Sequence, residues 1–464
     1  MKMVSFRSRA GLSIPALVLF AVSLLHFLII GPQNLLLKDL RISILIISLF
    51  IAQSLLLKHF LGASNIKKGN SSVSQSVANI SILQPLAFSL IFLSIQILTI
   101  HLRGIESFLL LIEDPQSFGY YSLALNISDP LTYLREWLAL MQVPLLYWGG
   151  HLATHLPGYP FMIYFGFHLF GSNPQSVSWL VILFSTLTLF PLFYLAKLVH
   201  GHRAATITCT FYTWIPSVSL GLPYMELTLS IFTTTALLLF IRSLGPKGKA
   251  SRSILGGLTL SFAAFLTFVS TSLLVLATIL AVSRGAWQRA LLRVFYFISA
   301  ALVPYLFLGL ALRLPLYEAV MWALRTHNWF YHHLHSLRPE IWSIEISTLF
   351  FFLLLGLPTC ILFLVTVFRA CASSLRHTEV DKFTLAFSTM LLVVILLARL
   401  ELARVALFAL PMLVTCVAGT VIRSKPEGSL YRNCLLLSLA QFLETFSYLS
   451  QSGILSGMLG YPVV

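Results

Sequence analysis

Apolar runs long enough to cross a lipid bilayer recur along almost the whole chain, and they constrain its fold more than any other feature. A spanning helix needs roughly 17 to 25 mostly apolar residues. A chain of 464 residues that is 58% hydrophobic and 10% charged cannot bury that much apolar surface in a water-soluble core. We therefore predict an all-α, polytopic membrane protein. The runs lie near 11–31, 41–57, 82–102, 175–197, 204–222, 227–243, 294–312, 345–368, 383–399, 404–422 and 433–450, and 253–284 splits into two shorter spans near Ser270, which makes about thirteen helices.

The basic residues indicate how these spans are oriented. They lie in short clusters between apolar runs rather than along one amphipathic face, so the net charge of +15 does not indicate nucleic-acid binding. Lys and Arg concentrate in cytoplasmic loops, which predicts a cytoplasmic N-terminus and a first run, 11–31, that is an uncleaved anchor. Most of the 30 basic residues then lie inside. The 15 acidic residues lie on the outer side except for Glu379, Asp381, Glu427 and Glu444.

Two polar segments interrupt the spans on the predicted outer side. The first contains E-D-P-Q (113–116) and ends in H-L-A-T-H-L-P-G-Y-P (151–160). The apolar stretch 159–171, at about 13 residues, is too short to cross, so we predict an interfacial or re-entrant helix there. The second segment is rich in histidine and aromatic residues. The predicted organisation is 1–102, N-terminal spans; 103–172, first outer loop with juxtamembrane helices; 173–312, spans; 313–344, second outer loop; and 345–464, C-terminal spans.

Carboxylates on an outer loop could act as a general base that deprotonates an acceptor hydroxyl, if a lipid-borne donor can reach them. Asp114 and Glu113 are the first candidates. The alternative is that such residues are solvated loop charges or helix caps. Asp129 fits that alternative, because it directly precedes an apolar run that begins after Pro130.

Histidines and arginines on the same side could contact a phosphate or a sugar. His151 and His155 are four residues apart, but the Pro157–Gly158 pair follows directly, which disfavours a helical zinc site. The cluster His327, His332, His333 and His335 has irregular spacing and no nearby Cys or Asp. Hydrogen bonds to substrate are the favoured role for these histidines and for Arg325. The sequence indicates no cofactor and leaves a divalent metal open.

A short turn holds Arg399, Glu401 and Arg404 between two apolar runs. Arginine at a membrane boundary is costly unless it pairs with a lipid phosphate or a carboxylate. The turn predicts either a grip on a lipid phosphate or a structural Glu–Arg pair. Glu444, within the last run, is predicted either to pair with one of these arginines or to make a polar contact inside the bundle.

Three of these segments, taken in order, resemble a known family. E-D-P-Q (113–116), H-L-A-T-H-L-P-G (151–158) and E-L-A-R-V-A-L-F-A-L-P (401–411) resemble motifs of the GT-C membrane glycosyltransferases, which use polyprenyl-phosphate sugars. The last two are closest to a bacterial group of GT-C-like membrane proteins. The resemblance covers roughly 100–425 and implies a GT-C-like bundle. It departs from the family where Leu156 replaces the first proline of His-Pro-Pro-Gly, which loosens the turn, and where three spans rather than one precede the loop.

The resemblance also implies roles for individual residues. Asp114 or Glu113 would be the base, His155 would lie near the donor, and Arg404 would hold the lipid phosphate. With the residues above, it leads us to expect an inverting transfer, on the outer face of the cell membrane, from a polyprenyl-phosphate sugar to a glycan, lipid or protein hydroxyl. Partners would be these substrates and membrane lipids, without nucleic acid. The further substrate-binding candidates are His151, Arg325, His327, His332 and Glu401.

Two other functions stay open from the sequence. A transporter or flippase of a lipid-linked sugar would also expose a polar face, but transporters usually show internal repeats, broken paired helices and charges at the bilayer midplane. Here Glu444 is the main charge within the spans. A non-catalytic subunit of a membrane assembly is the third interpretation.

Overall fold

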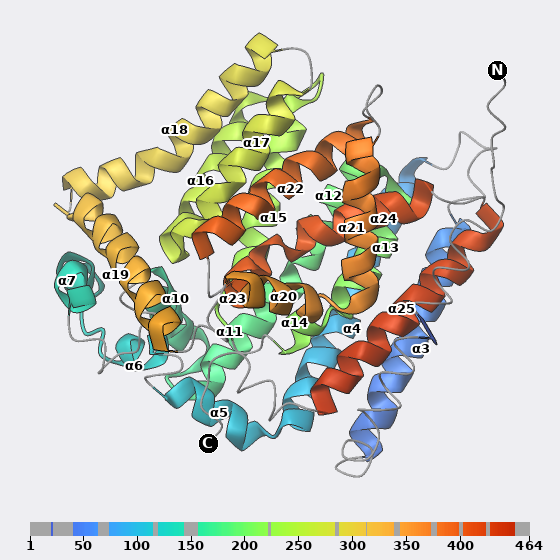
Figure 1. Cartoon of the computed structure of the whole chain (residues 1–464), viewed down its shortest axis with the longest axis horizontal. Helices are drawn as coiled ribbons and strands as arrows, with labels where there is room; N and C mark the ends of the chain where they lie inside the picture. The colour runs from blue at the N-terminus through green and yellow to red at the C-terminus, as the bar shows by residue number, and fades with distance from the viewer. Residues whose placement is uncertain are drawn as a thin grey trace.

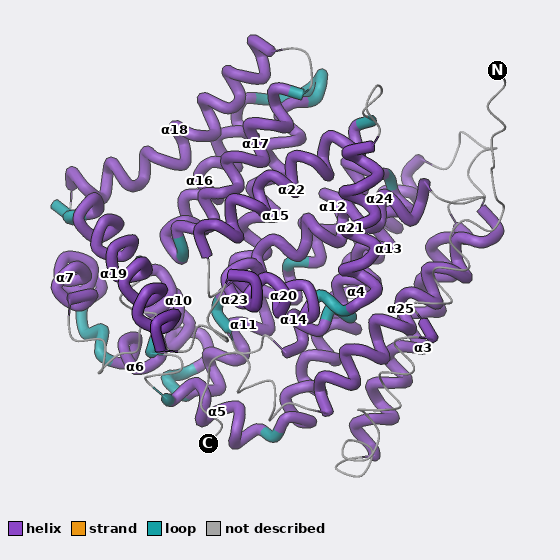
Figure 2. The backbone as a smooth tube through the Cα atoms, in the orientation of Figure 1, coloured by secondary structure: helices purple, strands orange, loops and turns teal. Residues whose placement is uncertain are grey.

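All the regular secondary structure in the described part of the chain is helical, and this part contains no strand, which confirms the all-α class predicted from the sequence (Figures 1 and 2). The structure is a computed structural model, and its seven to eight long apolar helices make the chain a multi-pass membrane protein. The described residues are 20–21, 40–63, 74–114, 119–142, 156–220, 224–283, 287–311, 313–337, 344–372, 378–398, 402–423 and 427–450.

Seven described segments are long and apolar enough to cross a membrane. An eighth is counted if α20 and α21, a bent pair described below, form one span. The predicted run 11–31 lies outside the described residues apart from 20–21, and the predicted run 433–450 lies in α25 (Glu427–Ser450), which is not among the segments apolar enough to be counted as spans. The count of about thirteen therefore stays a prediction. The seven lie in α3 (Leu40–Ala63), α4 (Ser74–Arg103), α11 with α12 (Pro174–Leu187 and Leu189–His200), α15 (Glu226–Leu244), α18 (Trp287–Ala311), α22 (Glu379–Ala398) and η5 with α24 (Ala406–Ala409 and Leu410–Arg423).

Other predicted spans are divided into shorter helices. The run 204–222 forms α13 (His202–Thr213) and α14 (Pro216–Leu220), because Pro216 cannot donate the hydrogen bond that would continue α13. The stretch 253–284 forms α16 (Ala250–Leu266), the one-turn helix η3 (Phe268–Ser272) and α17 (Leu273–Val282). Both parts are apolar but shorter than a full span.

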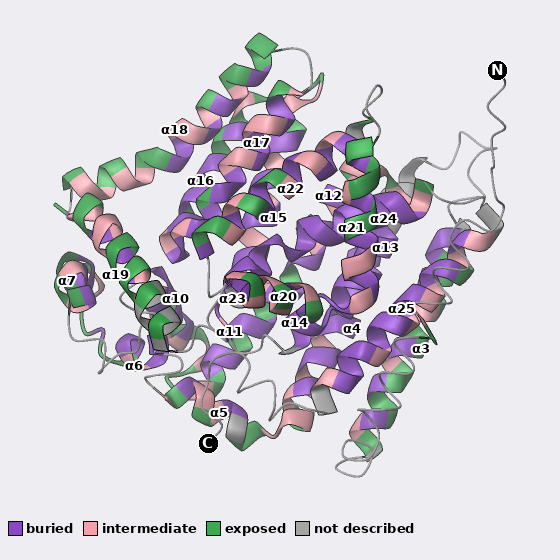
Figure 3. Cartoon of the chain, in the orientation of Figure 1, coloured by how far each residue is buried: buried purple, intermediate pink, exposed green. Residues whose placement is uncertain are grey.

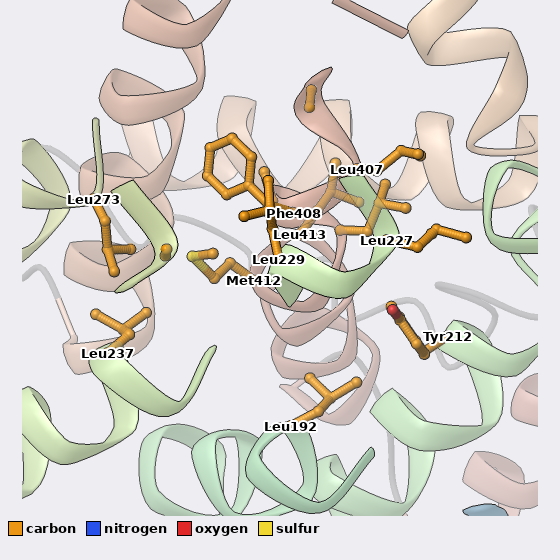
Figure 4. Close-up of a cluster of buried hydrophobic side chains, with 14 of the residues drawn as sticks. Leu192, Tyr212, Leu227, Leu229, Leu237, Leu273, Leu407, Phe408, Met412 and Leu413 are labelled. Atoms are coloured by element: carbon orange, nitrogen blue, oxygen red, sulfur yellow. The ribbon is translucent and has the colours of Figure 1, made fainter. Parts of the chain in front are cut away.

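The core lies between α12, α13, α15 and α24. The span Ala406–Arg423 is 89% buried in the bundle, whereas Trp287–Ala311 is only 17% buried, and Figure 3 shows the same contrast between α24 and α18. Leu192, Leu229 and Leu413 are fully buried in this core. Figure 4 shows them beside side chains from α13, α17 and η5. Because lipid is as apolar as these side chains, close packing rather than water exclusion holds such a core together.

One end of the bundle is closed by contacts from basic side chains, and we call it the basic end. Arg293 Nη2 donates to the Gly248 carbonyl at 3.0 Å, and Lys382 Nζ donates to the Ser283 carbonyl at 3.0 Å. Arg423 Nη1 lies 2.7 Å from Asp381 Oδ1. These contacts tie the α15–α16 turn to α18, the end of α17 to α22, and α22 to α24.

The opposite end carries short helices, and we call it the acidic end. It holds α5 (Ile105–Glu113), α6 (Tyr120–Leu125), α7 (Pro130–Gln142), the start of α10 (Gly158–Phe170), α19 (Leu316–Leu337), α20 (Ile344–Leu354) and α23 (Leu402–Val405). The chain turns from α4 into α5 at Gly104, whose φ of +88° suits glycine. The predicted short helix over 159–171 is α10, which Gly171 ends with a φ of +83°.

The predicted span 345–368 differs from a straight helix. It consists of α20 and α21 (Leu357–Ala372), which meet at an angle of 110°. Gly356, at the break, has a φ of +79°, a conformation that glycine adopts without steric cost. Of the two roles predicted for Glu444, the structure shows a polar contact inside the bundle: Glu444 Oε2 accepts the Leu357 N–H at 2.6 Å.

Candidate functional site

The two predicted catalytic carboxylates lie at the C-terminal end of α5. Phe108 and Ile112 bury one face of this helix against the bundle, where α5 packs on α4, α6 and α11. The helix ends at Asp114, whose backbone is extended and whose N–H donates to the Leu110 carbonyl. Carboxylates at this end of a helix meet the negative pole of the helix dipole, which does not stabilise the fold. Such an arrangement is typical of a functional site.

Glu113 is exposed, and its charge acts on Tyr121 in the next helix, α6. Burial raises the pKa of the Tyr121 hydroxyl above its ordinary value, and the Glu113 carboxylate raises this pKa further. The Tyr121 hydroxyl donates to the Ser172 carbonyl at 3.1 Å. Asp114 is half-buried. The pair therefore offers one solvent-facing and one partly sheltered carboxylate at the same helix end.

The H-L-P-G element joins this loop to the bundle through Gly158. A Cβ atom at Gly158 would overlap the Phe265 carbonyl and lie 2.7 Å from Leu266 Cα, so the start of α10 touches the backbone at the end of α16. The next residue, Tyr159, is fully buried, and its ring centroid lies 5.1 Å from that of Tyr120 in α6. Thus α10 connects the carboxylate loop to the transmembrane helices. His151 and His155 lie outside the described residues.

The two segments that the sequence places on the outer side meet where α19 packs on α7. Trp322 Nε1 donates to the Met141 carbonyl at 3.1 Å, and Figure 1 shows the two helices side by side. On α19, Arg325 and His332 are exposed and His327 is half-buried. These three candidates therefore lie on the helix that packs on α7, while Glu113 and Asp114 lie at the end of α5, which packs on α4, α6 and α11.

The third motif segment forms α23 and the one-turn helix η5 at the same end. The Leu402 N–H donates to Ser347 Oγ at 3.2 Å. Ser230 Oγ and Thr233 Oγ1 of α15 donate to the Leu407 and Phe408 carbonyls of η5 at 3.2 and 3.3 Å. Arg404 lies on α23, although its side chain lies outside the described set, as does Glu401 altogether.

Glu226 is a candidate that the sequence analysis did not single out. It is the first residue of α15 and is 1% exposed. A buried carboxylate is costly unless it is compensated, and the positive pole of the α15 dipole is one compensation. Two residues earlier, Tyr224 interacts electrostatically with Arg103, at the end of α4. The signal in the sequence was a lone acidic residue directly before an apolar run, but its burial depends on how the bundle packs around the start of α15.

No group of three or more His, Cys, Asp or Glu side chains able to hold a metal ion occurs among the described residues. The described residues of the acidic end offer several carboxylates, among them the candidates Glu113, Asp114 and Glu226, and cationic or neutral donors on α19. Chemically, this set suits proton abstraction and contact with an anion more than assembly of a metal centre.

Comparison with known proteins adds a likeness in fold. No family model and no curated protein matches the chain. The solved structure of ArnT from Cupriavidus metallidurans bound to undecaprenyl phosphate is 14% identical and covers 66% of this chain and 67% of its own, with a TM-score of 0.42. Its apo structure, also 14% identical, covers 71% and 72% with a TM-score of 0.44. Both structures show ArnT, a GT-C superfamily membrane glycosyltransferase.

The archaeal oligosaccharyltransferase AglB from Archaeoglobus fulgidus, solved with an inhibitory peptide and a dolichol-phosphate, is also similar in its helix arrangement. It is 12% identical and covers 70% of this chain, with a TM-score of 0.44. The matched part is 52% of AglB, so this chain spans about half of that protein's length.

The close contact at Gly158 gives a first testable consequence. Gly158→Ala is expected to displace the start of α10 from α16, because the added Cβ meets backbone atoms that cannot move aside. Overpacking of this kind typically costs about 1–3 kcal/mol. Thermal unfolding in detergent should show a lower Tm. Gly166→Ala is the matched control, because its Cβ would meet only the flexible Leu180 side chain, at 3.3 Å. An equal Tm for both variants would contradict the assigned contact.

The cap of α7 gives a pH-dependent prediction. Hydrogen bonds from Thr132 hold the pKa of the Asp129 carboxyl below its ordinary value, and the Thr132 N–H lies 2.8 Å from Oδ2. The cap therefore stabilises α7 fully above about pH 4 and is lost as the pH falls through the lowered pKa. Amide exchange at Leu131 and Thr132 should accelerate in acid relative to Asp129→Asn, which caps without titrating. Equal exchange ratios at neutral and acid pH would contradict this.

Proposed function

We propose that this chain is an inverting membrane glycosyltransferase that moves a sugar from a polyprenyl-phosphate donor to a hydroxyl of a glycan, lipid or protein acceptor. The observation that carries the proposal is the position of the three motif segments. The carboxylates of α5, Gly158 of the H-L-P-G element and α23 with Arg404 all lie at the acidic end. Segments separated by up to about 290 residues in the sequence, from Glu113 to Arg404, thus lie at one end of the bundle, where a membrane-embedded lipid phosphate and a water-borne hydroxyl can meet.

The proposed reaction is a single displacement. Asp114 or Glu113 accepts the proton of the acceptor hydroxyl as its oxygen attacks the anomeric carbon. The bond from that carbon to the phosphate oxygen breaks on the opposite face, so the configuration inverts. The polyprenyl phosphate leaves with the electron pair, and Arg404 stabilises its charge, with Arg325, His327 or His332 of α19 as further donors. We assign His151, His155 and Glu401 to substrate binding on the basis of the motif resemblance.

The orientation in the membrane is part of the proposal. The basic end would face the cytoplasm together with the N-terminus, because Lys and Arg concentrate in cytoplasmic loops. The acidic end, with Glu113 and Asp114, would then face outward. A lipid-linked donor suits such a site, because the sequence contains no nucleotide-binding motif.

One observation favours transport of a lipid-linked sugar as a second candidate function. The break between α20 and α21 resembles the discontinuous helices of secondary transporters, in which free helix ends bind substrate. Here, however, the first amide of α21 already donates to Glu444, and the Leu355 carbonyl at the end of α20 accepts from Gln441. These two backbone groups are therefore used within the bundle, which supports the transferase over the transporter.

Proteoliposomes distinguish the two functions. The purified chain is supplied with a panel of polyprenyl phosphates carrying labelled sugars, together with a mixed set of hydroxyl acceptors. Transfer of label to an acceptor, with inverted anomeric configuration by NMR, would support the transferase. Label that crosses the bilayer while still attached to its lipid, without transfer from any donor, would support the transporter instead.

A further inference from the structure

The break at Gly356 is held from both sides by α25 (Glu427–Ser450). Gln441 Nε2 donates to the Leu355 carbonyl at 2.7 Å, and Gln441 Oε1 accepts the Thr359 hydroxyl at 2.8 Å. Glu444 Oε2 accepts the Leu357 N–H at 2.6 Å. The two α25 side chains thus bind the last turn of α20 and the first turn of α21.

We call these hydrogen bonds the α25 clamp, because they hold α20 and α21 at one angle to each other. Gln441 and Glu444 are 1% and 2% exposed, so water does not compete for their hydrogen bonds. Gly356 leaves room for Gln441, because a Cβ there would overlap that side chain. The Glu444 carboxylate also meets the positive pole of the α21 dipole. Since α21 is part of the bundle, fixing the angle fixes where α20 lies at the acidic end.

The next contact leads from α20 to α23. Ser347 is 6% exposed and its Oγ accepts the Leu402 N–H. The helix α23 has only four residues and continues directly into η5, whose carbonyls Ser230 and Thr233 of α15 bind, so its C-terminal side is fixed by the bundle and its N-terminal side is held by α20. Its first amides have no partner within the helix, so the hydroxyl of Ser347 acts as a cap supplied by another helix. The direction in which α23 extends from η5 therefore depends on the position of α20, which holds its first amide.

We propose that Ser347, Gln441 and Glu444 are positioning residues for the phosphate-holding part of the transferase site. Through the angle at Gly356 and the Ser347–Leu402 hydrogen bond, they set the place and direction of α23, the helix that carries Arg404. This inference rests on the proposed function, because it assumes that Arg404 holds the donor phosphate. None of the three residues contacts substrate, and their effect passes through α20.

Sugar transfer in proteoliposomes over a series of donor concentrations tests the inference. Ser347→Ala should raise the KM for the donor about five- to tenfold, the effect of one lost hydrogen bond. The acceptor KM should stay unchanged, and Ser347→Thr, which keeps the hydroxyl, should restore the donor KM. Glu444→Ala should also raise the donor KM. Glu444→Gln should raise it less, because the amide oxygen of glutamine can still accept the Leu357 N–H.

Ser253→Ala is the matched control. Ser253 is fully buried and its Oγ lies 2.7 Å from Ser243 Oγ, at the basic end. If the wild type transfers sugar and Ser347→Ala has the donor KM and Tm of Ser253→Ala, the positioning role is wrong and the proposed function stands. If the wild type transfers no sugar from any donor, both proposals are wrong.

Hydrogen exchange of the Leu402–Val405 amides adds a readout that does not require activity. Glu444→Ala should accelerate their exchange at least about tenfold relative to Ser253→Ala. When α20 moves away from α23, the hydrogen bond from the Leu402 N–H to Ser347 Oγ breaks, and this amide exchanges faster. Unchanged exchange in Glu444→Ala would overturn the link between α25 and α23.

Discussion

Replacing both carboxylates at the end of α5 by their amides, in the double variant Asp114→Asn and Glu113→Gln, is expected to lower kcat for sugar transfer by about 10²- to 10⁴-fold. This is the range that a positioned general base contributes. Neither amide can accept the proton of the acceptor hydroxyl, while the size of each side chain is kept. The KM for the donor should change little, because in the proposed mechanism the donor phosphate is held by Arg404.

The single variants would show which carboxylate is the base. Asp114 is half-buried and Glu113 is exposed. Water competes less with the acceptor hydroxyl for a partly sheltered carboxylate, so we expect Asp114→Asn to account for most of the loss in kcat. Glu136→Gln is the matched control, because Glu136 is an exposed carboxylate on α7 at the same end of the bundle. Full activity in the double variant would show that neither residue is the base.

The second large effect is expected at Arg404. Arg404→Ala should lower kcat/KM for the donor by about 10²- to 10³-fold, the loss seen when one group that stabilises developing charge is removed. Arg404→Lys should recover only part of this activity, because lysine keeps the charge but cannot form the bidentate contact of a guanidinium with phosphate.

Arg135→Ala serves as the control for this variant. Arg135 is an exposed arginine on α7, so its removal changes the net charge equally without touching α23. The measurement is initial transfer rate at several donor concentrations in proteoliposomes. If Arg404→Ala matches Arg135→Ala in kcat/KM, the structural Glu–Arg pair is the better interpretation of the E-L-A-R segment.

The fold class could be predicted from the sequence because lipid requires long apolar helices, and their lengths are visible residue by residue. Span interruptions were harder to predict. The run 345–368 is continuous in hydropathy, yet it breaks at Gly356. Pro358 lacks the N–H that a continuous helix would use, and Gln441 and Glu444, far along the chain, bind the backbone on both sides. Hydropathy reports how a residue interacts with lipid but not which distant side chain replaces a backbone hydrogen bond.

In the candidate site, too, residues with a local signal in the sequence could be predicted, and residues whose environment depends on tertiary packing could not. Asp114 and Glu113 were predicted because they lie on an outer loop that a lipid-borne donor could reach, in a segment that resembles a family motif. Glu226 was not predicted, because it is a single acidic residue in a short turn, and its burial depends on tertiary packing at the start of α15. Likewise, a local motif indicated that Gly158 ends a turn, but its contact with α16 depends on the packing of helices about 100 residues apart.

The clamp formed by α25 also has a consequence for how the protein is made. Ribosomes synthesise α25 after every element that it holds, which includes α21 through Glu444 and the end of α13 through the hydrogen bond from Thr445 Oγ1 to the Trp214 carbonyl, 2.5 Å long. Backbone groups without partners are costly in hydrocarbon, so the amide of Leu357 must be satisfied by other means until α25 packs against α21. The packing of this helix is therefore the step that supplies partners on both sides of the break at Gly356, and a nascent chain that stalls before Gln441 would leave the Leu355 carbonyl and the Leu357 amide without these two partners.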